Sequence, residues 1–406
     1  MQLILFLRAS RCALRWRYPL LHHGFIAHMK RTLLLPILVL IGLGLAYPRI
    51  SVASGNMDHQ DLKRMVGQSI MVGFNGTTVE APGFRIVLEN LERGIIGGVL
   101  ILPQNIAGKS ELEAMVTALK QCVCETPPLI AIDEEGGTVD WLGVEHGFPR
   151  TASAAEIGKS NEDEARHQYK ALAKKLAGIG FNLNFGPVVD LNLNPNNPII
   201  GVRERSFSAD AGVVTKYAKI FIEEHHAQNI LTALKHFPGH GSSVADTHTA
   251  PADVSLTWSP DELIPYKLLI EAGMADMIMA GHLTNNARWG GTATQQGATA
   301  ISQILRRDLG YNGVVVSDDL TMKALANGRR TFAEVAGSAA KAGIDLFVVA
   351  HPVAPEIENT GLYVNSVLLD GIQSGDISLE IVTKAWERMI ALKSKLTPSE
   401  RPPGTH

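Results

Sequence analysis

The chain has 406 residues, of which 46% are hydrophobic and 6% aromatic, and its formal net charge is −3. This composition excludes a disordered or fibrous protein, and the length is sufficient for one large core or two small ones. Because the charge is near neutral and no block of like-signed residues stands out, we expect neither nucleic acid nor an acidic membrane surface as a partner. A small, uncharged or weakly charged partner is favoured.

Residues 1–53 contain the parts of a secretory leader. A basic start at Met29-Lys30-Arg31 precedes an apolar run over 33–47 and a small-residue cleavage site at 51–53. The run is shorter than the roughly 20 residues that span a bilayer, so we expect cleavage and no stable membrane anchor. We therefore predict that translation starts at Met29, that residues 1–53 are a leader, and that the protein is periplasmic or secreted.

Beyond residue 57, short β-rich apolar runs alternate with longer amphipathic stretches, which is typical of a parallel sheet covered by helices. Most of the runs are almost continuously apolar, as in strands that are buried on both faces. The sequence predicts eight strands, at 69–74, 97–102, 129–133, 182–190, 231–236, 277–282, 313–318 and 346–351.

Helices are predicted between the strands, at 110–120, 162–176, 211–226, 260–271, 302–309 and 331–341, with a final helix at 379–395. Ser259 before Pro260 predicts an N-cap, and Gly178 and Gly343 predict two helix ends. No glycine-rich dinucleotide fingerprint follows the first strand, which disfavours a doubly wound sheet. We predict an α/β fold with a single (β/α)8 TIM-type barrel over 54–396, no second large domain, and a flexible tail over 397–406.

Cys122 and Cys124 are separated by one residue, a spacing that we expect to be too short for an ordinary unstrained disulfide. No histidine or further cysteine accompanies them at the spacing of a zinc site. We expect a structural or incidental role for both, and no metal.

Ionisable residues stand where most of the predicted strands end. In a barrel the carboxyl ends of the strands converge on one mouth, where active sites are built. A single polar residue at a strand end commonly caps a helix, but several together favour a functional site. The residues are Asp133, Asp190, Lys235, His236, His282, Asp318, Asp319 and His351.

The loop after the fifth predicted strand is rich in histidine. Pro238-Gly239 prevents His236 and His240 from sharing a helix face, which disfavours a metal pair and favours a packing role for His240. In Asp246-Thr247-His248 the carboxylate can accept the ring N–H and orient the imidazole for proton transfer. Asp318, at the end of a buried strand, has the position of a nucleophile or of a helix cap; Asp319 is an alternative cap.

Four motifs then occur in the order found in the family 3 glycoside hydrolases. They are IDEEGG at 132–137, GVRERSFSAD at 201–210, KHFPGHG at 235–241 followed by DTH at 246–248, and VVVSDDL at 314–320. From about residue 60 to 350 the chain resembles the single-domain β-N-acetylglucosaminidases of this family, the NagZ-type β-hexosaminidases.

The resemblance implies that Asp318 forms a covalent glycosyl-enzyme and that His248, paired with Asp246, is the acid/base, so that the anomeric configuration is retained. It also implies that four residues bind the sugar hydroxyls: Asp133, Arg205, Lys235 and His236. The expected substrate is a terminal β-linked N-acetylglucosamine, on a muropeptide in peptidoglycan recycling or on a chitin oligosaccharide. No cofactor and no metal are expected.

One departure from the family pattern concerns the residues after the E-G-G, where the family usually has arginines and this chain has Thr138 and Trp141. A tryptophan can stack on a sugar face, so the preferred substrate stays open. Three alternatives also stay open: a family 3 β-glucosidase, a sugar-binding barrel without turnover, and a metal-dependent hydrolase that uses His236, His240 and His248.

Overall fold

The computed structural model of the chain describes residues 58–248, 251–294, 299–326 and 330–396, which belong to one compact unit. The predicted leader over 1–53, with its start at Met29, and the predicted tail over 397–406 lie outside the described residues. No helix within the described ranges has both the length and the apolar character needed to cross a membrane.

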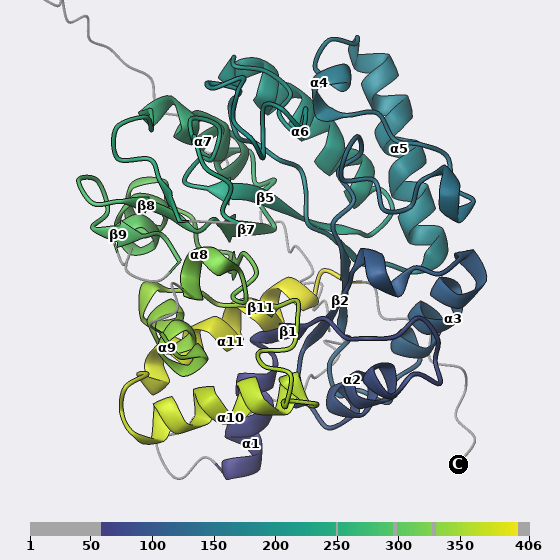
Figure 1. The fold of residues 1–406 in the computed structure, drawn as a ribbon, viewed down its shortest axis with the longest axis vertical. Coiled ribbons are helices and arrows are strands. Elements are labelled where there is room, and N and C mark those ends of the chain that lie inside the picture. Colours follow the sequence, from purple (N-terminus) through teal and green to yellow (C-terminus); the bar gives the residue numbers. More distant parts are fainter. Residues whose placement is uncertain (1–57, 249–250, 295–298, 327–329, 397–406) are drawn as a thin grey trace, which may run out of the picture. The chain divides into compact units, whose positions relative to one another are not determined.

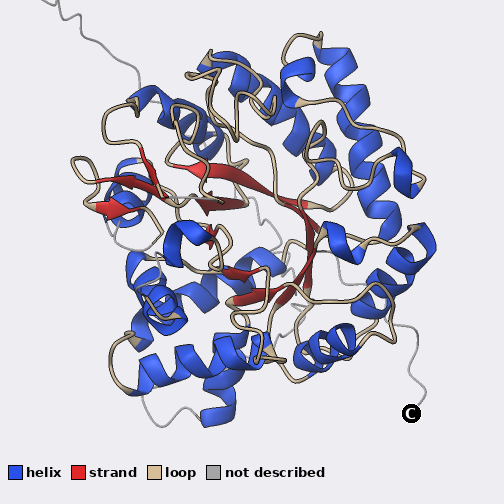
Figure 2. Cartoon of the chain, in the orientation of Figure 1, coloured by secondary structure: helices blue, strands red, loops and turns tan. Residues whose placement is uncertain are grey.

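Eight parallel strands form the centre of the fold, and helices surround them (Figure 1, Figure 2). The strands pair in the order β10-β7-β5-β4-β3-β2-β1-β11, and a bridge between Val316 and Leu346 joins the two outer strands into a barrel. The prediction of a single (β/α)8 barrel and of its eight strands is therefore confirmed. The strands are β1 (Ile70–Val72), β2 (Gly98–Ile101), β3 (Leu129–Ile132), β4 (Leu183–Asn184), β5 (Leu231–Phe237), β7 (Met277–Ala280), β10 (Val314–Ser317) and β11 (Phe347–Val349).

Strand β4 is much shorter than the predicted 182–190. Pro187 has no N–H to donate to a neighbouring strand, so the regular ladder stops before it. The chain pairs with β5 again one residue later, where Val188 and Lys235 form an isolated parallel bridge. This irregular stretch leads directly to Asp190, which lies at the mouth of the barrel.

Alternate residues of each strand face the barrel interior and the surrounding helices. In β10, Val314 and Val316 belong to the interior cluster, whereas Val315 belongs to the outer cluster between strands and helices. This alternation follows from the two-residue period of a strand, and it explains why the strands are apolar throughout: both of their faces are buried.

The helices follow the strands as predicted, with some differences at their ends. The segment predicted at 260–271 is a 3-10 turn (Pro260–Leu263) followed by α7, and the segment predicted at 302–309 is a π-helical stretch, Thr299–Asp308. Five helices were not predicted: α1, α2 and α10, and the short α4 and α8. The helices of two or more turns are α1 (His59–Gly67), α2 (Pro82–Glu92), α3 (Lys109–Lys120), α5 (Glu162–Ile179), α6 (Ala211–His226), α7 (Ile264–Glu271), α9 (Phe332–Ala342), α10 (Thr360–Gln373) and α11 (Leu379–Lys393); the short ones are α4 (Ala154–Ile157) and α8 (Lys323–Ala326).

Two of the three predicted helix boundary signals are confirmed. The hydroxyl of Ser259 accepts the N–H of Asp261, and Gly343 ends α9 in the left-handed conformation, at φ 103°. The prediction for Gly178 is wrong, because α5 continues through it to Ile179 and ends at Gly180, which has φ 113°. Only a residue without a Cβ adopts this conformation at little cost.

A small second sheet lies beside the loops that leave β5 and β7. It consists of β6 (Ala252–Asp253), β8 (Leu283–Asn285) and β9 (Gly291–Thr292). Because β8 follows β7 after two residues, this sheet lies near the carboxyl ends of the barrel strands (Figure 1).

Helix α11 closes the other end of the barrel. Its residues Met389 and Leu392, together with Leu396, complete the interior cluster. Beside them the buried Lys393 donates from Nζ to Gln68 Oε1 at 2.7 Å and to Gly97 O at 2.8 Å. Burial lowers the pKa of Lys393 to about 7. The N-terminal end of the barrel is thus filled, which leaves the carboxyl ends of the strands as the open end.

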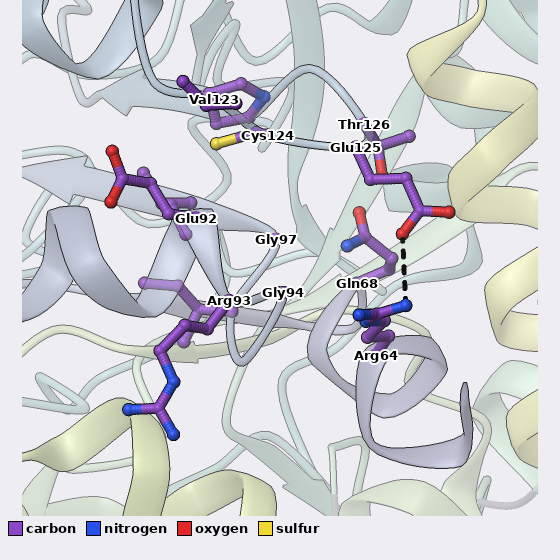
Figure 3. Close-up of a pocket in the computed structure, with 13 residues that line it drawn as sticks. Arg64, Gln68, Glu92, Arg93, Gly94, Gly97, Val123, Cys124, Glu125 and Thr126 are labelled. Atoms are coloured by element: carbon purple, nitrogen blue, oxygen red, sulfur yellow. Dashed lines mark ion pairs between the residues drawn. The ribbon is translucent and has the colours of Figure 1, made fainter. Parts of the chain in front are cut away.

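Cys122 and Cys124 are joined by a disulfide, a pairing that the sequence did not predict. The chain turns at this point and brings their Cα atoms to 5.4 Å, which is an ordinary separation for bonded cysteines. The disulfide borders a cavity of about 160 Å³ before β2 and β3, where Arg64 is directed at Glu125 (Figure 3). This cavity lies at the N-terminal ends of the strands, away from the predicted site.

Candidate active site

All seven predicted site residues lie at the carboxyl ends of the barrel strands. Asp133 follows β3, Lys235 and His236 are in the last part of β5, and Asp318 follows β10 directly. The three others are on loops: Arg205 between β4 and α6, and Asp246 and His248 after β5.

Four of the charged residues form a buried network. Lys235 donates from Nζ to Asp133 Oδ1 at 2.5 Å, and its Nζ is 2.7 Å from Glu135 Oε1. Arg205 donates from Nε and Nη2 to the two oxygens of Glu135, at 2.8 and 2.7 Å. Such two-pronged contacts fix the orientation of the guanidinium group as well as its position. The network therefore brings Asp133, Lys235 and Arg205 together.

Opposite charges keep this network ionised. Burial alone would raise the pKa of Glu135, but the charges of Arg205 and Lys235 hold it well below its ordinary value. Burial alone would lower the pKa of Lys235, but the charges of Asp133 and Glu135 raise it above the ordinary value. Glu135 and Lys235 therefore both keep their charges in the neutral pH range.

Glu135 is the central member of this network, and the strand-end argument did not select it. It lies beyond the end of β3, where Gly136 and Gly137 adopt left-handed conformations at φ 94° and 62° and turn the chain. Its place in the IDEEGG motif was the signal that could have identified it.

His236 is held by Asp190. Its Nδ1 donates to Asp190 Oδ2 at 2.7 Å, and Asp190 Oδ1 accepts the backbone N–H groups of His236 and His240, at 3.1 and 2.8 Å. With the proton on Nδ1, Nε2 is left as an acceptor, and it lies 3.4 Å from Arg205 Nη2. His236 therefore joins the network, and Asp190 fixes its ring.

Asp318 is partly buried at the end of β10. Its backbone N–H donates to Ala280 O at 3.1 Å, and its Oδ1 accepts the N–H of Asp319 at 2.8 Å. Burial raises the pKa of Asp318, but it ends below its ordinary value because of the charges of His282 and His236, the Asp319 N–H, and the charge of His248. The carboxylate is thus ionised and directed by rigid neighbours, as a nucleophile requires.

The capping role belongs to Asp319. Its carboxylate accepts the N–H and the hydroxyl of Thr321, at 3.0 and 2.6 Å, and the N–H of Ala350 at 3.0 Å. Asp319 therefore satisfies backbone groups of the loop, whereas the Asp318 carboxylate lies near the rings of His236, His248 and His282.

Asp246 and His248 form a dyad on the loop after β5. Asp246 Oδ1 accepts Nδ1–H of His248 at 2.7 Å and its backbone N–H at 2.9 Å. Burial raises the pKa of Asp246, but the hydrogen bonds from His248 lower it below the ordinary value. The side chain of His248 is 56% exposed, so Nε2 can exchange a proton with water or with a bound molecule.

His240 is buried, as expected for a packing residue. Burial lowers the pKa of its ring to about 4, which keeps it neutral. Within the described ranges, no group of three or more His, Cys, Asp or Glu side chains has the arrangement of a metal site.

The loop 138–142, which departs from the family pattern, is held by hydrogen bonds to Glu134. Glu134 accepts the N–H groups of Trp141 and Leu142, at 2.9 and 3.2 Å, and pairs with Lys175 at 2.8 Å. The ring of Trp141 is partly buried and packs against the outer hydrophobic cluster. Thr138 donates its hydroxyl to Arg203 O at 3.1 Å.

A family model described as the glycosyl hydrolase family 3 N-terminal domain matches residues 66–392. Among curated relatives, β-hexosaminidase A of Pseudoalteromonas piscicida is 31% identical over 339 residues, which are 77% of this chain but only 55% of that protein. The β-hexosaminidase of Tolumonas auensis is 32% identical over 299 residues, 70% of this chain and 82% of that protein.

Solved structures are similar over most of the chain. A glycoside hydrolase family 3 β-N-acetylglucosaminidase from Paenibacillus sp. has a TM-score of 0.73 at 31% identity, covering 82% of this chain and 62% of that one. A β-N-acetylhexosaminidase from Beutenbergia cavernae has a TM-score of 0.71 at 26% identity, covering 84% of this chain and 99% of that one.

Proposed function

The chain belongs to glycosyl hydrolase family 3, and from this premise we propose that it is a retaining exo-β-N-acetylglucosaminidase. It removes terminal β-linked N-acetylglucosamine from peptidoglycan fragments or chitin oligosaccharides. The observation that carries the proposal is the combination, at one mouth, of an ionised strand-end carboxylate, Asp318, with the Asp246–His248 dyad, whose imidazole is exposed.

The reaction proceeds in two steps. Asp318 attacks the anomeric carbon while the bond from that carbon to the leaving oxygen breaks, and protonated His248 gives its Nε2 proton to that oxygen. The product is a glycosyl ester of Asp318. Neutral His248 then takes a proton from water, the hydroxide attacks the anomeric carbon, and the Asp318 carboxylate leaves. Two inversions at one carbon give net retention.

Asp246 supports His248 in both steps. Because its carboxylate accepts Nδ1–H, it keeps Nε2 as the nitrogen that exchanges the proton, and it stabilises the imidazolium form. The same dyad therefore allows His248 to donate a proton from Nε2 in the first step and to accept one there in the second.

The buried network binds the sugar in this proposal. Asp133, Lys235, Arg205 and His236 present charged groups and one imidazole acceptor to the hydroxyls of a single sugar ring. Charge-assisted hydrogen bonds of this kind discriminate hexoses by hydroxyl orientation, because a mismatched sugar leaves a buried polar group unpaired.

The β-hexosaminidase names of the relatives support an N-acetylhexosamine as the substrate rather than glucose. The predicted leader favours a periplasmic or secreted location, where fragments of peptidoglycan or chitin are accessible. We therefore place the enzyme in peptidoglycan recycling or chitin breakdown.

The test uses the mature chain from Ser54 with 4-nitrophenyl β-N-acetylglucosaminide and the matching β-glucoside. We expect hydrolysis of the first to be much faster, and NMR to detect the β-anomer as the first product. A 5-fluoro glycosyl fluoride should label the peptide that contains Asp318. Preference for the glucoside would indicate a β-glucosidase, release of the α-anomer would contradict the two-step mechanism, and no turnover would indicate a sugar-binding barrel.

A further inference from the structure

The backbone of the segment 238–243 connects the sugar-binding end of β5 to the Asp246–His248 dyad, and two buried carboxyl groups hold it. One is Asp190, which also fixes His236. The other is Glu262, in the turn Pro260–Leu263 before α7, whose side chain is fully buried. The mechanism proposed above gives Glu262 no part.

Glu262 lies tightly against this segment. Its Oε2 accepts the backbone N–H of Gly241 at 2.8 Å. A Cβ added to Gly239 would lie 2.4 Å from the Glu262 Cβ and 2.6 Å from Oε2, so no larger residue fits between them. On the other side, a Cβ on Gly241 would lie 1.6 Å from Leu191 O. The loop backbone is therefore clamped between Glu262 and the chain at Leu191.

The surroundings of Glu262 favour its neutral form. Burial and the charge of Asp190 raise the pKa of Glu262 to about 8, although the N–H of Gly241 and the N–H and hydroxyl of Ser242 lower it. Tyr266 is another titratable group near Glu262: burial and the charges of Asp190 and Glu262 raise its pKa. His240, between Gly239 and Gly241 in the chain, has a neutral ring because burial lowers its pKa to about 4. A neutral carboxyl holds the loop without placing a second negative charge beside Asp190.

We propose that Glu262 is a positioning residue for the acid/base dyad: by holding the N–H of Gly241 it fixes the segment that carries Asp246 and His248 over Asp318. It acts through His248 and does not contact the sugar. The inference rests on the proposed function, since it assigns a role in proton donation to the leaving oxygen.

The test exploits the fact that a good leaving group departs without a proton. The wild type and Glu262→Ala are compared on phenyl and 2,4-dinitrophenyl β-N-acetylglucosaminides. If Glu262 acts through His248, kcat/KM for the phenyl substrate falls about 10- to 100-fold, part of the contribution typical of a general acid. For the 2,4-dinitrophenyl substrate kcat/KM changes less than about threefold, because the bond to this leaving group breaks without acid assistance.

Two conservative variants separate the hydrogen bond from mere packing. Glu262→Gln keeps an oxygen that accepts the Gly241 N–H, and we expect values within about threefold of the wild type on both substrates. In Glu262→Asp the side chain is too short to reach Gly241, so we expect the same selective loss of kcat/KM on the phenyl substrate. This variant tests the positioning role if Glu262→Ala does not fold. A Gln variant as poor as the Ala variant would overturn the proposal.

Asp276→Asn is the matched control. Asp276 is also a buried carboxyl that accepts a backbone N–H, that of Thr232, but at the opposite end of β5. We expect Asp276→Asn to change kcat/KM by the same factor for both substrates. Equal losses on both substrates in Glu262→Ala and Glu262→Asp, or no loss on either, would overturn the positioning role in an active enzyme. A wild type inactive on both substrates would overturn the proposed function and the positioning role with it.

Discussion

Lys235 and His248 belong to the same stretch of chain, yet their side chains are 2% and 56% exposed. Lys235 is enclosed by carboxylates and keeps one charge, whereas His248 has a single carboxylate partner and faces solvent. A group that binds a neutral sugar gains from fixed, oriented charge, which a buried network supplies. A group that exchanges a proton twice in each cycle needs access to water. The two halves of the site are therefore built by different physical means.

The carboxylate between these halves gives the largest expected effect. Asp318→Asn removes the charge that attacks the anomeric carbon in the proposed mechanism, and we expect kcat to fall at least about 10³-fold while sugar binding persists. The measurements are steady-state kinetics and the affinity for N-acetylglucosamine by calorimetry. Turnover within tenfold of the wild type would mean that another residue is the nucleophile.

The buried half of the site, which contains Glu135, Arg205 and Lys235, is tested through its contribution to the free energy of unfolding. Glu135→Gln leaves the charges of Arg205 and Lys235 without their shared partner, and we expect a loss of about 3–5 kcal/mol in the free energy of unfolding. Asp246→Asn, which removes the charge of the partly buried partner of His248, should lose less than about 1 kcal/mol. Urea denaturation measures both values. Equal losses would show that the two halves are held in the same way.

The exposed half is tested through its rate. His248→Ala should lower kcat/KM on the phenyl glycoside about 10²- to 10³-fold, because the proposed general acid is lost. The melting temperature should hardly change, since an exposed side chain stabilises little. Added azide should restore turnover of the glycosyl-enzyme. Val244→Ala, an exposed residue on the same loop, is the control and should retain wild-type kinetics.

Buried carboxyl groups also give the molecule a pH-dependent stability. Burial raises the pKa of both Glu134 and Glu262 to about 8, from 4.5 in the unfolded chain. Between these values the unfolded chain has released protons that the folded protein still holds, so both groups make stability fall as pH rises. Glu262→Gln removes one of them.

The variant should therefore gain stability relative to the wild type between pH 5 and 8, by about 1 kcal/mol per pH unit. Urea denaturation at three pH values within this window gives the slope. Asp246→Asn, on the exposed loop, should run parallel to the wild type in the same window. Parallel curves for Glu262→Gln would show that Glu262 is ionised in the folded protein.

A chelator should have the smallest effect. The site residues are arranged as ion pairs and a His–Asp dyad, with no three-donor cluster among the described residues. We expect hydrolysis of the N-acetylglucosaminide to be unchanged after dialysis against EDTA. Loss of activity that zinc restores would favour the metal-dependent hydrolase.

The barrel was predictable because its strands are buried on both faces and so form apolar runs that the sequence displays directly. The helix α10 was not, because it contains two glycines, Gly361 and Gly371, which weaken any local helical signal. A Cβ on Gly361 would lie 2.7 Å from Ile96, so close packing with the chain before β2 requires this glycine. Helices such as α10 form because of tertiary contacts, and a local sequence pattern contains no information about those contacts.

The same distinction applies to the site. Asp133, Lys235, His236 and Asp318 follow from one rule, since each lies at a strand end. Glu135 does not, because its position depends on the turn made by the two glycines after it. Arg205 was assigned through the family motif alone. Its ion pair with Glu135 joins residues 70 positions apart, which no spacing rule anticipates.

The closure of the barrel by α11 has a consequence for the order of synthesis. Lys393 contacts Gln68 and Gly97, which precede it by 325 and 296 residues, and Met389, Leu392 and Leu396 complete the interior cluster. A growing chain therefore has no complete barrel interior until its last helix has left the ribosome. Contacts between such distant residues form late and slowly.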